Sequence, residues 1–208
     1  SLRERIAAAA AKSGRTPTAV KLIAVSKGHP AEAIQEALTA GLEDFGEHYL
    51  QELRDKAVQT SGASPQPRWH YQGTLQRRKI KEILKIAHSL FSVARAEEFE
   101  EIDRRAEKPI TCLIEVNIAS EPQKNGVLPE ELPGIIEVAR SLHKIELTGL
   151  MCVPPAEEDP RPRFRELRDL ARRHDLPETS MGMSDDFEAA IEEGATMVRI
   201  GTALFGAR

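Results

Sequence analysis

The sequence predicts an α/β fold: a closed (β/α)8 barrel of the TIM type that spans residues 1–208 as a single domain, with an extra helix at its N-terminus. Eight short apolar segments alternate with amphipathic helical segments along the chain. Such alternation implies parallel strands with right-handed crossovers, and eight strand–helix units suggest that the sheet closes on itself. A doubly wound open sheet is the alternative, but its GxGxxG signature does not follow the first strand.

The expected elements follow one another with only short connections. In order, we expect a helix over 2–12, a strand over 21–27, a helix over 30–41, a strand over 43–47, a helix over 49–60, a strand over 68–73, a helix over 75–87, a strand over 89–94, a helix over 96–107, a strand over 110–119, a helix over 129–143, a strand over 145–153, a helix over 161–175, a strand over 178–182, a helix over 184–194 and a strand over 196–201. Ser184 and Gly194 are the expected caps of the last helix. Because no helix is expected after the last strand, the N-terminal helix is expected to cover that gap.

Composition argues against several classes of protein. The chain has 29 basic and 33 acidic residues, so no basic excess points to nucleic acid. No apolar run approaches the length of a membrane span, and the charged, alanine-rich start is typical of a helix rather than a signal peptide. Cys112 and Cys152 fall inside expected strands, where a cysteine acts as a small buried hydrophobe rather than a disulfide or metal ligand. We therefore expect a soluble, cytoplasmic protein that binds no metal.

In a barrel of this kind the working face lies at the carboxyl ends of the strands. The loops after the last two strands commonly form a phosphate site. Here they carry hydroxyls and glycines, namely Ser180, Gly182, Ser184, Gly201 and Thr202. Plain helix capping by Ser184 and a tight turn at Gly182 are the alternative interpretation.

Lys27 ends the first strand, which neighbours the eighth in a closed barrel. A ligand with a carbonyl at one end and a phosphate at the other would bridge the lysine and the phosphate site. Pyridoxal phosphate (PLP) is such a ligand, and proteins hold it as a lysine Schiff base. Arg199 lies two residues before Gly201, on the same side of its strand, where it could face the ring nitrogen of the cofactor. An ion pair with a carboxylate inside the barrel is the alternative for Arg199.

Other strand ends supply weaker candidates. Asn117 closes the fifth strand on the same face as Glu115, and we expect the asparagine to reach a ligand. Met151, in the sixth strand, is either core or a cofactor contact, and His48 follows the second strand. His70 is expected to pack within the third strand.

Six motifs together resemble the pyridoxal phosphate homeostasis protein family, whose members share their barrel with the N-terminal domain of alanine racemase. They are VSKGHP, FGEHYLQE, WHYQGTLQRRK, LIEVNIASEPQKNG, LTGLMCVPP and SMGMSDDFEAAIEEGATMVRIGTALFGAR, which lie between residues 22 and 208. The resemblance implies that Lys27 carries PLP as a Schiff base and that Arg199 lies near the cofactor. It also implies a set of residues around the phosphate: Ser180, Ser184, Gly201 and Thr202.

The chain departs from the family pattern at three places. His48 stands where the family usually has asparagine, although an imidazole can also donate a hydrogen bond. Gln72 stands where the family has an apolar residue, and Arg78 precedes Lys79 where an asparagine is usual.

The resemblance favours a monomeric, non-catalytic protein of intracellular PLP homeostasis, with PLP-dependent apoenzymes as recipients. A PLP-dependent racemase or lyase is the alternative, and a sugar-phosphate aldolase with Lys27 as its Schiff-base residue is a third. Racemisation needs proton donors and acceptors on both faces of the cofactor. Alanine racemases take one of them, a tyrosine, from a separate β-domain of the partner subunit, and neither Tyr49 nor Tyr71 matches that tyrosine by position. Aldolase barrels usually place their lysine on a later strand.

Overall fold

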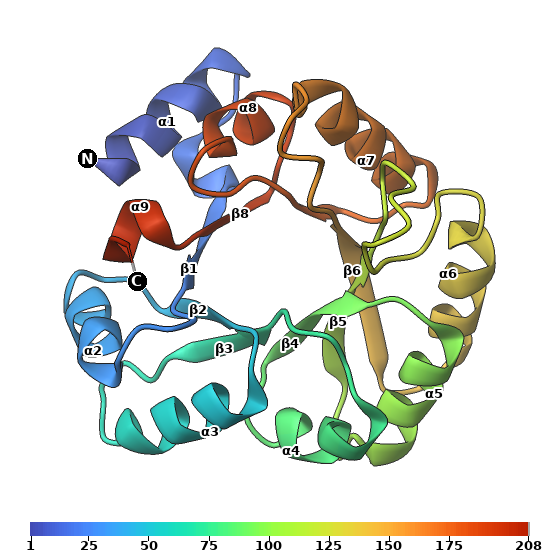
Figure 1. Ribbon diagram of the computed structural model, residues 1–208, viewed down its shortest axis with the longest axis horizontal. Coiled ribbons are helices and arrows are strands. Elements are labelled where there is room, and N and C mark those ends of the chain that lie inside the picture. The colour runs from blue at the N-terminus through green and yellow to red at the C-terminus, as the bar shows by residue number, and fades with distance from the viewer. Residues whose placement is uncertain (208) are drawn as a thin grey trace.

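Eight parallel strands close into a barrel with helices around its outside in the computed structural model, which describes residues 1–207 (Figure 1). The strands follow one another around the barrel in chain order, and the eighth pairs with the first. The predicted closed (β/α)8 barrel is therefore confirmed, and the open-sheet alternative is wrong.

The elements have the following bounds. The strands are β1 (Lys21–Val25), β2 (Asp44–Glu47), β3 (Arg68–Tyr71), β4 (Ser89–Val93), β5 (Ile110–Glu115), β6 (Ile145–Met151), β7 (Glu178–Ser180) and β8 (Met197–Ile200). The α-helices are α1 (Leu2–Lys12), α2 (Ala31–Thr39), α3 (Leu50–Gln59), α4 (Ile80–Leu84), α5 (Ala96–Arg105), α6 (Leu132–Ser141), α7 (Arg161–Arg173), α8 (Phe187–Glu192) and α9 (Thr202–Phe205). Two 3-10 turns are η1 (Pro17–Ala19) and η2 (Arg77–Lys79).

The helix after β7 begins later than its sequence predicts. α8 starts at Phe187 with Asp186 as its N-cap residue, so the expected capping by Ser184 is wrong. The carboxylate of Asp186 instead accepts from the backbone N–H of Met183 at 2.6 Å, which closes a turn ahead of the helix. Gly194 adopts a φ of +107° one residue beyond the C-cap Glu193, which is where glycine usually ends a helix.

The gap after β8 is filled from both ends of the chain. A one-turn helix, α9, does follow β8, contrary to expectation. α1 lies beside α8 in the outer ring (Figure 1), where Arg5 forms an ion pair with Glu188 and Lys12 with Glu192. The N-terminal helix thus belongs to the wall of the barrel next to α8.

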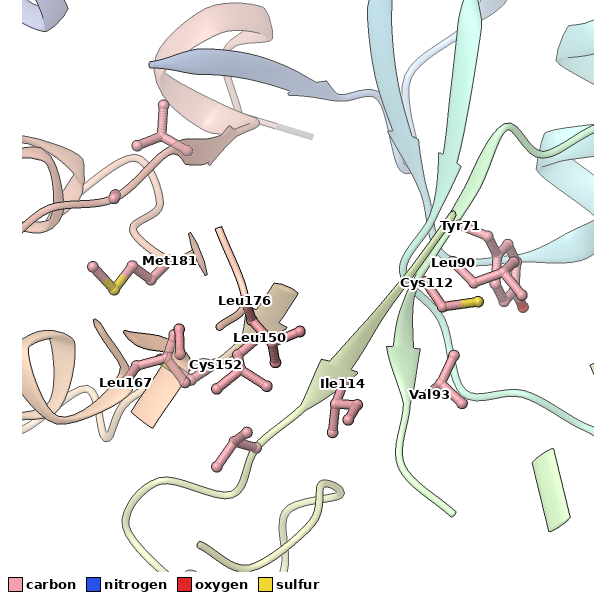
Figure 2. Packing of buried hydrophobic residues seen from close by; sticks show 14 of the residues in the cluster. Tyr71, Leu90, Val93, Cys112, Ile114, Leu150, Cys152, Leu167, Leu176 and Met181 are labelled. Atoms are coloured by element: carbon pink, nitrogen blue, oxygen red, sulfur yellow. The ribbon is translucent and has the colours of Figure 1, made fainter. Parts of the chain in front are cut away.

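Apolar side chains pack in two separate regions. The larger region lies between strands and helices, and Figure 2 shows part of it: Leu90 beside Cys112 and Ile114 beside Leu150, as the strand register requires. The smaller region consists of Ile23, Phe91, Leu113, Met151 and Met197. Since neighbouring side chains point to opposite faces of a strand, this second cluster fills the barrel interior.

Both cysteines are free thiols that are fully buried, as the sequence predicts. Cys112 and Cys152 belong to the outer apolar region (Figure 2). Burial raises the pKa of Cys152 to about 12, so this thiol stays neutral and packs as a hydrophobe.

A polar cluster lies toward the amino ends of the strands. His70 Nε2 lies 2.8 Å from Asp44 Oδ1, and His70 Nδ1 lies 2.5 Å from Ser89 Oγ. Arg68 donates to the same aspartate from the next strand. These contacts link β2, β3 and β4 at the end of the barrel away from the expected site.

No helix within residues 1–207 combines the length and the apolar character that crossing a membrane requires.

Candidate functional site

Lys27 lies in the turn that follows β1, at the carboxyl end of the barrel. Its side chain is half-buried, and Nζ lies 5.9 Å from the centre of the Tyr49 ring. A cation at that distance over an aromatic face is attracted by the ring. Gly28 follows with a φ of +76°, a conformation that favours glycine and lets the chain turn away directly after the lysine.

The loops after β7 and β8 meet beside the end of β1. The backbone N–H of Ala203 donates to Ser184 Oγ at 3.1 Å, which joins the two loops. β8 pairs with β1 up to Ile200, and a Cβ on Gly201 would lie 3.3 Å from the carbonyl oxygen of Val25. Thr202 follows Gly201 and is exposed. The structure thus brings Ser184, Gly201 and Thr202 to the strand end that carries Lys27.

Gly182 serves the packing of the β7–α8 loop. Its φ is +90°, and a Cβ there would lie 2.5 Å from the Cβ of Ala190 in α8. The residue is buried, and the absence of a Cβ lets the loop lie close against the helix.

Ser180 and Arg199 lie beneath these loops, inside the barrel. Nη1 of Arg199 donates to the carbonyl oxygen and the hydroxyl of Ser180, and Nη2 donates to the carbonyl oxygen of Cys152. Burial lowers the pKa of Arg199 from its ordinary value. No ion pair joins Arg199 to a carboxylate in the described part of the chain, so neutral oxygens hold the guanidinium and link β6, β7 and β8.

The other candidates have structural partners of their own. The amide of Asn117 accepts from the N–H of Glu121 at 3.0 Å and donates to the carbonyl oxygen of the same residue at 2.8 Å, which folds the loop after β5. Met151 is 3% exposed and belongs to the interior apolar cluster. His48 is half-buried directly after β2.

Glu115 lines a cavity of about 180 Å³ at the carboxyl end of β5, together with Ser92, Arg95 and Glu98. Burial raises the pKa of Glu115 to about 7, with the charge of Arg199 opposing the shift and that of Glu98 adding to it. A carboxyl group that titrates near neutrality therefore lies at the mouth of the barrel.

An ion cluster beside Lys27 was not predicted from the sequence. Lys56 Nζ donates to Glu47 Oε1 at 2.5 Å, to Glu52 Oε2 at 2.7 Å and to the carbonyl oxygen of Ser26 at 2.7 Å. Burial raises the pKa of Glu47, although hydrogen bonds from Lys56 and Ser26 act against that shift. The available signal was the i, i+4 spacing of Glu52 and Lys56 on an expected helix.

The fold and this site define a barrel with an amine and two hydroxyl-bearing loops at the carboxyl ends of neighbouring strands. The family described as alanine racemase, N-terminal domain, matches residues 1–208. The pyridoxal phosphate homeostasis protein of Pseudomonas aeruginosa is 44% identical over 98% of this chain and 91% of that protein. The pyridoxal phosphate homeostasis protein of Aquifex aeolicus is 42% identical over 99% of this chain and 94% of that protein. The chain belongs to the alanine racemase N-terminal domain family and, within it, to the pyridoxal phosphate homeostasis proteins.

Solved structures agree with this assignment. PipY of Synechococcus elongatus, determined with PLP bound, has a TM-score of 0.85 and 32% identity, covering 99% of this chain and 100% of PipY. Alanine racemase from Corynebacterium glutamicum has a TM-score of 0.67 and 20% identity over 99% of this chain and 60% of that enzyme. The second likeness shows the barrel fold alone.

Proposed function

We propose that this chain binds PLP through a Schiff base with Lys27 and serves intracellular PLP homeostasis without catalysing a reaction. The observation that carries the proposal is the meeting of Lys27 with Ser184, Gly201 and Thr202 where β1, β7 and β8 end. An amine and a set of hydroxyl donors on adjoining strand ends suit a ligand that has an aldehyde and a phosphate.

PLP supplies the aldehyde and the phosphate. In our assignment Nζ of Lys27 would hold the aldehyde as an imine, with its oxygen lost as water and no gain or loss of electrons. The hydroxyls of Ser184 and Thr202 and the backbone at Gly201 would hold the phosphate.

The remaining candidates shape the strands and loops around the site. Arg199 fixes Ser180, and Gly182 seats the β7–α8 loop on α8. We assign Asn117 to the shape of the β5–α6 loop and Met151 to the apolar interior beneath the mouth. His48 lies at the rim, after β2.

The placement of the tyrosines favours a carrier over a racemase. Tyr71 is buried at 2% exposure, and burial raises the pKa of its hydroxyl. Tyr49 lies next to Lys27 itself rather than across the barrel mouth from it. Neither tyrosine is therefore suited to act as a second base opposite the lysine. The proposal extends to a monomer that delivers PLP to apoenzymes.

The test is the visible absorption spectrum of the purified protein after addition of PLP. We expect an imine band that borohydride bleaches, with the reduced adduct mapped to Lys27 by peptide mass spectrometry. Lys27→Ala should lack the band, whereas Lys21→Ala, which removes an exposed lysine at the start of β1, should keep it. A band that survives in folded Lys27→Ala contradicts the assignment.

The phosphate contacts have a separate test. The double variant Ser184→Ala, Thr202→Val should weaken binding of PLP by about 10-fold or more, because hydrogen bonds to charged groups contribute about 1.5–3 kcal/mol. Binding of pyridoxal, which has no phosphate, should not change. An equal loss for both compounds would place the phosphate elsewhere.

The alternative function, a PLP-dependent racemase, has its own test. The PLP-loaded protein is incubated with single enantiomers of amino acids, and sustained racemisation that Lys27→Ala abolishes would make this chain an enzyme.

A further inference from the structure

Both peptide groups of Lys27 are held by one cluster of charged side chains, of which Glu47 and Lys56 are buried. On the amino side, the carbonyl oxygen of Ser26 accepts from Lys56 Nζ at 2.7 Å. On the carboxyl side, the N–H of Gly28 donates to Glu52 Oε2 at 2.8 Å. Glu52 Oε2 also accepts from Lys56 Nζ at 2.7 Å, so the two contacts belong to one network.

A second carboxylate completes the cluster from the neighbouring strand. Glu47 Oε1 accepts from Lys56 Nζ and from the hydroxyl of Ser26, the latter at 2.7 Å. The side chain of Glu47 is fully buried, and that of Lys56 is 6% exposed. The cluster therefore joins the end of β1, the end of β2 and helix α3 at the base of the Lys27 turn.

Such a cluster is an expensive way to stabilise a fold. Removing two charges from water costs several kcal/mol for each ion by effective estimates, and apolar residues of similar volume often stabilise a protein as well or better. What apolar side chains cannot do is hold a backbone carbonyl and a backbone N–H in fixed directions. Here Lys56 and Glu52 form hydrogen bonds with the peptide groups before and after Lys27.

The consequence for Lys27 is a fixed backbone. With the carbonyl of Ser26 and the N–H of Gly28 both held, the peptide planes on either side of Lys27 have little freedom to rotate, and its Cα–Cβ bond keeps one direction. The ammonium group lies over the ring of Tyr49, the N-cap residue of α3. A reactive group held in this way loses less entropy when it bonds to a ligand.

We propose that Lys56, with Glu47 and Glu52, is a positioning device for Lys27: it pins the two peptide groups of the lysine and so presents the amine for reaction with an aldehyde. This inference rests on the proposed function of Lys27 as the cofactor anchor. Glu47, Glu52 and Lys56 are positioning residues and act through the backbone.

The experiment uses Glu52→Met, which keeps the length of the side chain and removes the acceptor of the Gly28 N–H. Glu52 is suitable because its side chain is 31% exposed, so a methionine there leaves no buried cavity. The substitution also leaves both members of the buried pair, Lys56 and Glu47, in place. Glu52→Gln is the conservative variant, since its amide oxygen can still accept. Glu188→Met is the matched control, because Glu188 is 37% exposed and pairs with Arg5 on the outer wall.

Two readouts are needed. The first is the rate constant for imine formation with PLP and with pyridoxal, followed in the visible spectrum and trapped with borohydride at Lys27. Glu52→Met should react about 10- to 100-fold more slowly with both aldehydes, as expected for a displaced reactive group, while Glu52→Gln and Glu188→Met react at nearly the wild-type rate. The second is amide hydrogen exchange at Gly28, which should be faster in Glu52→Met and unchanged in Glu188→Met.

The outcomes separate this inference from the proposed function. If the wild-type protein forms no adduct at Lys27, the proposed function fails. The exchange rate of the Gly28 amide still reports whether Glu52 holds that N–H. If the wild-type adduct forms and Glu52→Met reacts at the wild-type rate, the positioning role is wrong although the anchor is right. A loss for PLP alone, with pyridoxal unaffected, also overturns the positioning role, because it would place Glu52 in the phosphate site.

Discussion

Arg199 donates two hydrogen bonds to Ser180, one to its carbonyl oxygen at 2.7 Å and one to its hydroxyl at 2.8 Å. The two residues stand on adjacent strands, β8 and β7, and the same guanidinium reaches the carbonyl oxygen of Cys152 after β6. Arg199, which the sequence predicts to lie near a cofactor ring, therefore supports the barrel wall beneath the loops that follow β7 and β8.

Arg199→Leu should lower the free energy of unfolding by about 3 kcal/mol. The reason is that the buried oxygens of Ser180 and Cys152 would lose the charged guanidinium that donates to them. Urea denaturation followed by circular dichroism measures the change. Arg165→Leu removes an exposed arginine that pairs with Glu193 and should have a smaller effect. Equal losses in the two variants would mean that the bonds to Ser180 and Cys152 stabilise the fold no more than an exposed ion pair does.

Asp44→Asn should abolish much of the acid sensitivity of the fold. Burial alone would raise the pKa of Asp44, but hydrogen bonds from His70 and Arg68 outweigh burial and hold that pKa well below its ordinary value of 3.8. The unfolded chain therefore takes up the proton first, so this stabilisation is complete above pH 3.8 and is lost as the pH falls further. Urea midpoints at a series of pH values should show wild type more stable than Asp44→Asn near neutrality and the difference shrinking toward low pH. A constant difference would contradict the lowered pKa.

The architecture could be predicted because it depends on local pattern. Alternating strand and helix segments determine parallel pairing, and eight units in chain order place the end of the first strand beside that of the eighth. That topology alone predicts that Lys27 lies near Gly201 and Thr202, and the register of β1 with β8 places Gly201 beside Val25, two residues before the lysine.

The contacts within the site could not be predicted, because they depend on how elements distant in sequence meet. Nothing in the sequence shows that Glu52 reaches back 24 residues to the N–H of Gly28. Nor does it show that Ser184 accepts from Ala203 instead of capping α8. Nor does it show that the amide of Asn117 bonds to the N–H and the carbonyl oxygen of Glu121, which requires the loop after β5 to have folded.

Gly149→Ala should destabilise the barrel severely. A Cβ there would lie 2.2 Å from the carbonyl oxygen of Glu178, so β6 and β7 would have to separate, and overpacking of this kind costs about 1–3 kcal/mol or more. Gly134→Ala is the control: it lies in α6 with no atom within 4 Å of the new Cβ, and alanine there should stabilise by about 0.5–1 kcal/mol. Thermal unfolding of both variants measures the contrast. A Gly149→Ala protein as stable as wild type would mean that the two strands are not packed this closely.

Glu115→Gln should stabilise the protein above neutrality and have little effect in acid. Burial raises the pKa of Glu115 from 4.5 to about 7, so the folded state holds its proton more tightly than the unfolded chain does. Stability is therefore lost as the pH rises from 4.5 to about 7 and stays lower above that range. The glutamine variant should avoid this loss, which we set at about 1–2 kcal/mol because partial exposure screens the charge.

The measurement for Glu115→Gln is the urea midpoint at a series of pH values across this range. Glu146→Gln on β6, an exposed position, corrects for the removal of one negative charge. An advantage of Glu115→Gln that does not grow with pH would show that Glu115 ionises in the folded barrel as readily as in the unfolded chain. A growing advantage would show that the mouth of the barrel keeps a carboxyl group protonated up to neutral pH, beside the cavity that Glu115 lines.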